Sequence, residues 1–291
     1  MFILKDLLEP LQENFSQTRQ GQKRKYWFVY TLLAVMLPFT SSMTSNLLRT
    51  LKTLFGLEVE SQRFYAFIGS TTLPWRKLWR TIWGLIPDPA VRGRIMVALD
   101  DSINPKTGKK IFGCASFHNH AAKNGQSSYP WSQCILAIGL LKKVKSRWVS
   151  MPLDFCFYHM EKEIEAKTIN VKRKGKAIPF ESKMEQAGKM LKDVQTLYQE
   201  PVLAVADSWF GNDGLWSQLE RGGKGKFNLL CRMRSNITLF DFLPTPAKDE
   251  PRKAGRPRKY GDRLGSVDEC ALRHKEKARS YKVFLYGKER E

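Results

Sequence analysis

Two short apolar runs in the chain each end in an acidic side chain that is followed by serine. Residues 95–99 lead into an acidic pair whose second member is Asp101, and residues 202–206 lead into Asp207. Carboxylate oxygens are the ligands that Mg²⁺ prefers, and two such ions about 3.5–4 Å apart can carry out phosphoryl transfer on DNA. The two acids therefore predict a divalent-cation site. The alternative is that each acid only caps the turn after its strand.

Rigid, adjacent strands would have to position these acids. A short apolar run bounded by polar residues is typical of a buried strand in a mixed or parallel sheet. An acid at the end of such a strand lies where the sheet meets water, and the sheet fixes its spacing better than a loop would. The metal-site interpretation therefore requires the strands over residues 95–99 and 202–206 to lie side by side in one sheet.

The order of predicted elements favours an α/β fold with that adjacency. We expect, in order, strands over residues 95–99 and 111–120, extended stretches over 134–141 and 148–158, a helix over 182–198, a strand over 202–206, a helix over 214–221 and a strand over 226–233. A strand meander followed by alternating helices and strands gives a mixed sheet flanked by helices. This order matches the ribonuclease-H-like arrangement, in which the first and fourth strands are neighbours.

The segments before and after this region have different patterns. Residues 1–90 read as an all-helical domain, in which Trp75, Trp79 and Trp83 are four apart and predict one helix stripe. We expect this stripe to pack in a core, and the alternative is a small DNA-binding domain with basic residues beside it. A catalytic core over residues 91–235 would then be followed by a basic, proline-rich segment from 236 to 291 that begins an inserted domain.

The charge of the chain favours a polyanionic partner. The chain has 49 Lys and Arg against 28 Asp and Glu, a formal net charge of +21. Neutralised phosphates release counterions, so this excess points to DNA, although an anionic membrane surface would attract it too. The apolar run over residues 26–39 is shorter than the roughly 20 residues of a membrane-spanning helix. Five cysteines without a CxxC pair and no signal peptide favour a cytoplasmic, nucleoid-associated protein without a membrane partner.

Three segments together resemble the bacterial insertion-sequence transposases of the DDE superfamily, which are retroviral-integrase-like. Residues 97–102 followed by 105–109 resemble the first catalytic block, residues 205–211 resemble the second, and residues 255–261 resemble a stretch before the third acid. The resemblance covers roughly residues 94–265. It implies a DNA transposase that uses Mg²⁺ (or Mn²⁺) to cut element ends and join them to target DNA, acting as a homo-oligomer on DNA.

The resemblance also implies roles for individual residues. Asp101 and Asp207 are the expected catalytic acids and metal ligands, since the first acid of the family directly precedes a Ser or Thr. Asp100 is the less favoured choice for the first acid, and otherwise it is expected, with Ser102 and Ser208, to lie just outside the metal ligands and to support them.

The third acid departs from the family pattern. The one Tyr-x-x-Arg start after the second acid, at Tyr260, leads to Val267 where the family has Glu. We therefore expect the catalytic Glu beyond residue 291 and a truncated transposase with the rest of its core missing. The alternatives are a catalytically inactive DNA-binding remnant of a transposase and a structure-specific metal-dependent nuclease.

Two basic segments are expected to hold DNA phosphates. They consist of Lys172, Arg173 and Lys174, and of Arg252, Lys253, Arg256, Arg258 and Lys259. The Gly-Arg-Pro-Arg sequence over residues 255–258 resembles an AT-hook, in which arginines enter a narrow and strongly negative minor groove. The alternative is a solvated basic loop.

Overall fold

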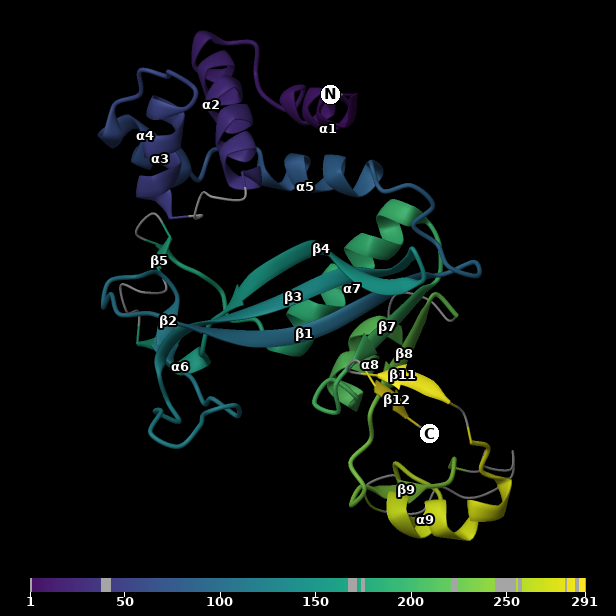
Figure 1. Cartoon of the computed structure of the whole chain (residues 1–291). Helices are drawn as coiled ribbons and strands as arrows, with labels where there is room; N and C mark the ends of the chain where they lie inside the picture. The colour runs from purple at the N-terminus through teal and green to yellow at the C-terminus, as the bar shows by residue number, and fades with distance from the viewer. Residues whose placement is uncertain are drawn as a thin grey trace. The chain divides into compact units, whose positions relative to one another are not determined.

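The chain forms two compact units (Figure 1). One unit contains residues 1–92 and 142–154, and the other contains residues 93–141 and 155–291. The computed structural model describes the chain except for residues 1, 38–42, 167–171, 174–175, 221–224, 244–254, 256–257, 281, 286–287 and 291. The division into domains over residues 1–90, 91–235 and 236–291 stays a prediction.

Five helices make up most of the first unit. They are α1 (Phe2–Gln12), α2 (Arg19–Met36), α3 (Thr44–Thr53), α4 (Ser61–Ile68) and α5 (Trp75–Gly84). Helix α2 begins where the Thr18 side chain accepts a hydrogen bond from the Gly21 amide, 3.1 Å away, and so caps a free backbone donor. In the part of the chain that the structure describes, no helix is long and apolar enough to cross a bilayer.

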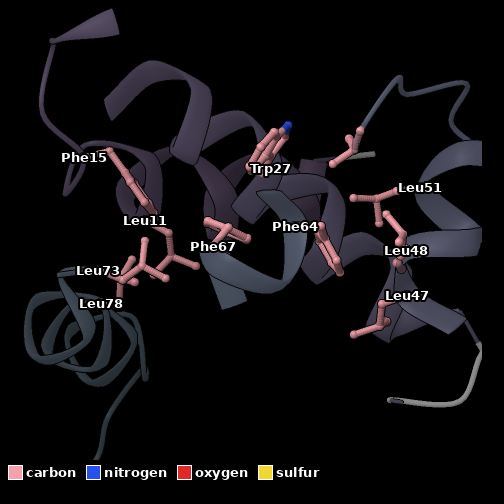
Figure 2. Close-up of a cluster of buried hydrophobic side chains, with 12 residues drawn as sticks. Leu11, Phe15, Trp27, Leu47, Leu48, Leu51, Phe64, Phe67, Leu73 and Leu78 are labelled. Carbon is pink, nitrogen blue, oxygen red and sulfur yellow. The ribbon is translucent and has the colours of Figure 1, made fainter. Parts of the chain in front are cut away.

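The core of this unit is a cluster of buried apolar side chains that the helices share (Figure 2). Trp27, Phe64 and Phe67 lie at its centre, and the rings of Trp27 and Phe67 meet edge to face with centroids 5.6 Å apart. Leucines extend the cluster at both ends, among them Leu11 on one side and Leu51 on the other. The helical pattern over residues 1–90 thus corresponds to helices that bury a shared apolar cluster.

The predicted tryptophan stripe is only partly a core stripe. Trp83 is buried and donates through Nε1 to the carbonyl of Leu153, 2.6 Å away, whereas Trp75 is 45% exposed. The buried residue in the middle of α5 is Leu78. A step of four residues overshoots one helical turn by about 40°, so residues four apart drift away from a common face. The expectation that the stripe packs in the core was therefore wrong for Trp75.

A six-stranded mixed sheet lies mainly in the second unit, and residues 142–154 of its third and fourth strands are counted in the first. Its strands are β1 (Ile95–Pro105), β2 (Cys114–Ser116), β3 (Trp131–Val144), β4 (Arg147–Tyr158), β7 (Val202–Ala206) and β8 (Phe227–Cys231). The order is β2-β3-β1-β7-β8, with β4 paired to β3. Strand β1 is antiparallel to β3 and parallel to β7, which is parallel to β8. This is the predicted ribonuclease-H-like arrangement. Strand β1, the first strand, lies beside β7, which takes the place of the fourth strand in the predicted fold.

Two helices connect the parallel strands. Helix α7 (Lys183–Tyr198) precedes β7, and α8 (Asp213–Glu220) lies between β7 and β8. Helix α7 packs on β1, on β7 and against α8, and α8 packs on β8. The two helices therefore cover the sheet (Figure 1). The apolar face of α7 carries Ala187, Leu191 and Val194, all fully buried, as the helical spacing of the sequence predicts.

The meander differs from the sequence-based expectation in one strand. The strand expected over residues 111–120 is confined to Cys114–Ser116. It is short because the chain turns on both sides of it: Gly113 has φ of 73°, and the Asn119 side chain accepts from the amide of Ala121. The stretches expected over residues 134–141 and 148–158 are the longer strands β3 and β4.

The remaining described elements are short. They are α6 (Glu161–Glu165), β5 (Lys172–Arg173), β6 (Lys176–Ala177), β9 (Thr238–Phe240), β10 (Arg263–Ser266), α9 (Val267–Arg273), a 3₁₀ turn (Lys275–Lys277), β11 (Val283–Leu285) and β12 (Lys288–Arg290). The strands among them form three separate two-stranded sheets, β5 with β6, β9 with β10 and β11 with β12.

The start of α7 is fixed by a capping box. The Ser182 side chain accepts from the amide of Glu185 at 3.3 Å, and the Ser182 amide donates to the Glu185 carboxylate at 2.8 Å. Replacing Ser182 by Ala should destabilise the protein by about 1 kcal/mol, because a backbone donor of the first turn loses its partner. Urea denaturation at pH 7 measures the loss, and Ser182→Thr, which keeps the hydroxyl, should retain most of the stability.

The same contact predicts how the loss depends on pH. Hydrogen bonds from the backbone and the side chain of Ser182 hold the pKa of Glu185 below its ordinary value of 4.5. A lowered folded-state pKa stabilises the protein above the unfolded pKa, and this stabilisation disappears as the pH falls through the folded pKa. The stability difference between wild type and Ser182→Ala should therefore shrink below pH 4.5. A constant difference down to pH 3 would rule out the carboxylate contribution.

Candidate active site

The two acids predicted from the sequence lie where the ladder between β1 and β7 ends, with Asp101 inside β1 and Asp207 directly after β7. The strand expected over residues 95–99 is longer than predicted, because its pairing with β3 continues through Asp100 and Asp101 to Pro105. In the parallel ladder of β1 and β7, Leu99 is paired with Ala206. Asp100 follows Leu99 within β1, Asp207 directly follows the last residue of β7, and Asp101 lies one residue further along β1. The chain thus brings Asp100 and Asp207 to the same end of the β1–β7 ladder.

Asp101 is bound by a lysine from helix α7. The ammonium of Lys183, the first residue of α7, lies 2.6 Å from Asp101 Oδ2, and the two side chains are only 17% and 25% exposed. The thiol of Cys134, on the neighbouring strand β3, donates to the same oxygen at 3.7 Å. Two cationic or polar donors therefore converge on one oxygen of the first acid.

Two aromatic rings complete the surroundings of this lysine. The Lys183 ammonium lies 5.1 Å from the ring centroid of Tyr158, at the end of β4, and 5.1 Å from that of Trp209. Trp209 follows Asp207 by two residues, so its indole joins the loop after β7 to the pair of Asp101 and Lys183. Cation–π attraction of this kind stabilises an ammonium that has lost part of its water.

The second acid shapes the turn after β7. Asp207 Oδ1 accepts hydrogen bonds from the amides of Trp209 at 2.9 Å and Phe210 at 3.4 Å, and Phe210 is fully buried beneath the turn. The capping role that the sequence left open is therefore present. Both hydrogen bonds end on Oδ1, so capping and cation binding through Oδ2 do not exclude each other.

The charges of the three carboxyl groups act on one another. Partial burial raises the pKa of Asp100, and the negative charges of Asp101 and Asp207 raise it further, against a hydrogen bond from the Asp101 amide. Burial likewise raises the pKa of Cys134, to about 11, so its thiol is protonated at neutral pH. For Lys183, burial alone would lower the pKa, but the hydrogen bond and the negative charge of Asp101 raise it overall.

The donor chemistry of this edge fits a divalent cation. Asp100, Asp101 and Asp207 offer the hard carboxylate oxygens that such an ion prefers, and the negative charges of Asp101 and Asp207 both act on Asp100. Within the described ranges, no three His, Cys, Asp or Glu side chains are already gathered around one point. The contact that competes with a metal ion is the ammonium of Lys183 on Asp101.

The two serines expected beside the acids differ from each other in their surroundings. Ser102 is exposed and faces Ile135 across the β1–β3 ladder, and Ser208 is half-buried in the turn after Asp207. Lys183 was not anticipated, although the start of its helix was. The predicted boundary at residue 182 located the side chain on α7, but only the packing of α7 on β1 brings it to Asp101.

Only part of the predicted basic segments can be placed. Lys174, Arg252, Lys253 and Arg256 lie outside the described residues, and Lys172 and Arg173 form strand β5. The ammonium of Lys259 is 2.9 Å from the Asp213 carboxylate, and Arg258 lies 3.6 Å from that of Asp262. All four of these side chains are largely exposed, so such pairs exchange readily with water or another anion.

A basic pocket in the helical unit was not anticipated. It encloses about 250 Å³ between α2 and α4 and is lined by Gln20, Lys23, Arg24, Trp27, Arg63, Ala66 and Phe67. The four residues from α2 follow the i, i+3, i+4, i+7 spacing of one helix face, a signal that the sequence contained. Lys23 lies over the Trp27 ring at 5.2 Å, and Arg24 donates to Thr72 at 2.9 Å.

The sheet order and the acids at its edge define a ribonuclease-H-like α/β unit with a candidate metal site. The family model described as DDE superfamily endonuclease matches residues 11–283. The chain therefore belongs to the DDE superfamily endonucleases, and it is a metal-dependent enzyme of the nuclease type. No curated protein matches the chain.

Proposed function

We propose that this chain is a DNA transposase of a bacterial insertion sequence, which cleaves the element ends and joins them to target DNA with Mg²⁺ (or Mn²⁺). The observation that carries the proposal is that Asp101 within β1 and Asp207 directly after β7 lie where the parallel ladder of these two neighbouring strands ends, in a DDE-family chain. In this proposal Asp101 and Asp207 are the metal ligands, and Asp100 supports them from the same edge.

The residues of the site have separate tasks in this reaction. A divalent cation supplies activation of the attacking oxygen and stabilisation of the leaving oxygen. Asp101 and Asp207 would bind it, and the ladder between β1 and β7 holds the two segments that carry these acids side by side. The hydrogen bonds from the amides of Trp209 and Phe210 hold the Asp207 carboxylate in one orientation. The Asp207 carboxylate therefore needs no reorientation when substrate arrives.

DNA is the proposed substrate, held by a homo-oligomer at paired element ends. The net charge of +21 supports a polyanionic ligand. The basic pocket of the helical unit adds a local reason, since Lys23, Arg24 and Arg63 line it together. Arg258 and Lys259 remain proposed phosphate contacts that exchange their surface carboxylates for DNA.

Replacing Lys23 by Gln should weaken binding to duplex DNA of any sequence. One lost phosphate contact lowers the slope of log K against log salt concentration by about 1. Fluorescence anisotropy over a range of salt concentrations measures this slope. Lys5→Gln is the matched control, because Lys5 is also an exposed helical lysine but lies outside the pocket and pairs with Glu9. Equal slopes for both variants would remove the pocket from the DNA interface.

The test of the function is an assay for both cleavage and joining. The purified chain is incubated with duplex DNA carrying the element ends, with target plasmid and with Mg²⁺, Mn²⁺ or EDTA. Transposition predicts metal-dependent nicks and covalent joints between donor 3′ ends and the plasmid. Nicks without joints would identify a structure-specific nuclease. DNA binding without either product would identify an inactive DNA-binding remnant, and both results would overturn the proposal.

A further inference from the structure

The lysine beside the first acid is unusual in being sheltered. The Lys183 side chain is 17% exposed, whereas that of Lys189, further along the same helix, is 63% exposed and pairs with Glu181. Holding a shielded ammonium at 2.6 Å from a carboxylate requires compensation for lost water. Asp101 and the two aromatic rings supply it.

The position of this ammonium conflicts with metal binding at Asp101. The ammonium occupies Oδ2, one of the two oxygens through which that carboxylate would bind a cation. A divalent ion placed on the same carboxylate would lie within a few ångströms of a positive charge, where repulsion is weakly screened. The ion and the ammonium therefore compete for Asp101.

We propose that Lys183 is a positioning residue that holds Asp101 in the free protein and keeps its affinity for divalent cations low until DNA is bound. This inference rests on the proposed function, since it takes Asp101 as a metal ligand. A phosphate group of bound DNA at the edge of the sheet offers the ammonium a second anionic partner. The rings of Tyr158 and Trp209 lie beside the ammonium, so a shift from Asp101 towards the phosphate leaves it a stabilising contact.

The test measures Mn²⁺ binding directly, with no catalytic readout. Electron paramagnetic resonance of free Mn²⁺ gives the dissociation constant for the full chain without DNA. Lys183→Met should bind Mn²⁺ about tenfold more tightly or better, because one repelling charge is gone. Lys183→Arg keeps the charge and should behave as wild type, and so should Lys189→Met, the matched control on α7. Adding duplex DNA should bring wild type close to the affinity of Lys183→Met.

Two further variants separate the possible failures. Asp101→Asn should lose this Mn²⁺ site, and if it binds Mn²⁺ as wild type does, the proposed metal site itself is wrong. If Asp101→Asn loses the ion but Lys183→Met binds it no better than wild type, the role of Lys183 is overturned while the proposed function stands. Thermal unfolding checks each fold, and Lys183→Gln replaces Lys183→Met if the methionine variant does not fold.

Discussion

Replacing Asp101 by Asn should lower the rate of Mg²⁺-dependent DNA cleavage by at least about a hundredfold. Loss of a group that merely supports a metal ligand costs about 10- to 100-fold, and loss of a ligand itself should cost more. DNA affinity should remain near wild type, because removing a carboxylate takes no cation from the DNA-binding surface. Single-turnover cleavage and anisotropy on the same preparation measure the two effects.

The control for this prediction lies in the other unit. Asp6→Asn also removes one exposed carboxylate, from helix α1, and should cleave at the wild-type rate. Cleavage by Asp101→Asn at a wild-type rate would remove Asp101 from the site.

The matched variant at the second acid separates its two possible roles. Asn at position 207 can still accept from the amides of Trp209 and Phe210, so Asp207→Asn keeps the turn but loses the charge. A large loss of cleavage with unchanged stability would favour cation binding. Wild-type cleavage by Asp207→Asn would reduce Asp207 to a cap of the turn.

The second large effect concerns stability. Phe64→Ala should destabilise the helical unit by about 3–5 kcal/mol, since it removes a fully buried ring and leaves a cavity. Phe64 lies at the centre of the apolar cluster beside Phe67, with ring centroids 6.2 Å apart (Figure 2). Amide hydrogen exchange over residues 1–92 should quicken sharply, and this region-specific measurement avoids assuming one unfolding step for the chain.

The neighbouring residue provides the control. Tyr65 is next to Phe64 on α4 but is 47% exposed, so Tyr65→Ala should change exchange only slightly. Similar effects of the two substitutions would contradict the placement of Phe64 in the core.

Local patterns were enough to predict the sheet but not the contacts within the site. The apolar runs over β1 and β7 and the amphipathic spacing of α7 are properties of short segments, and their order along the chain predicted the adjacency of β1 and β7. The pairing of Lys183 with Asp101 depends on how α7 packs across the sheet, which no short segment encodes.

Errors arose where turns decided the outcome. The strand expected over residues 111–120 ends at Ser116, because the side-chain turn at Asn119 outweighs the alternating pattern. Residues four apart on α5 do not stay on one helix face, and for this reason Trp75 is exposed while Trp83 is buried. The roles of Asp101 and Asp207 stay predictions, because the pairing of β1 with β7 is necessary for a shared cation and does not by itself establish one.

The pairing of β1 with β7 also bears on how the protein is made. Asp101 and Asp207 are 207 − 101 = 106 residues apart, yet the first lies in β1 and the second directly follows β7, its neighbour in the sheet. At about 5–20 residues per second, a ribosome needs roughly 5–20 s to add that length. The nascent chain therefore carries Asp101 for several seconds before Asp207 is synthesised, and the proposed pair of acids cannot come together before then.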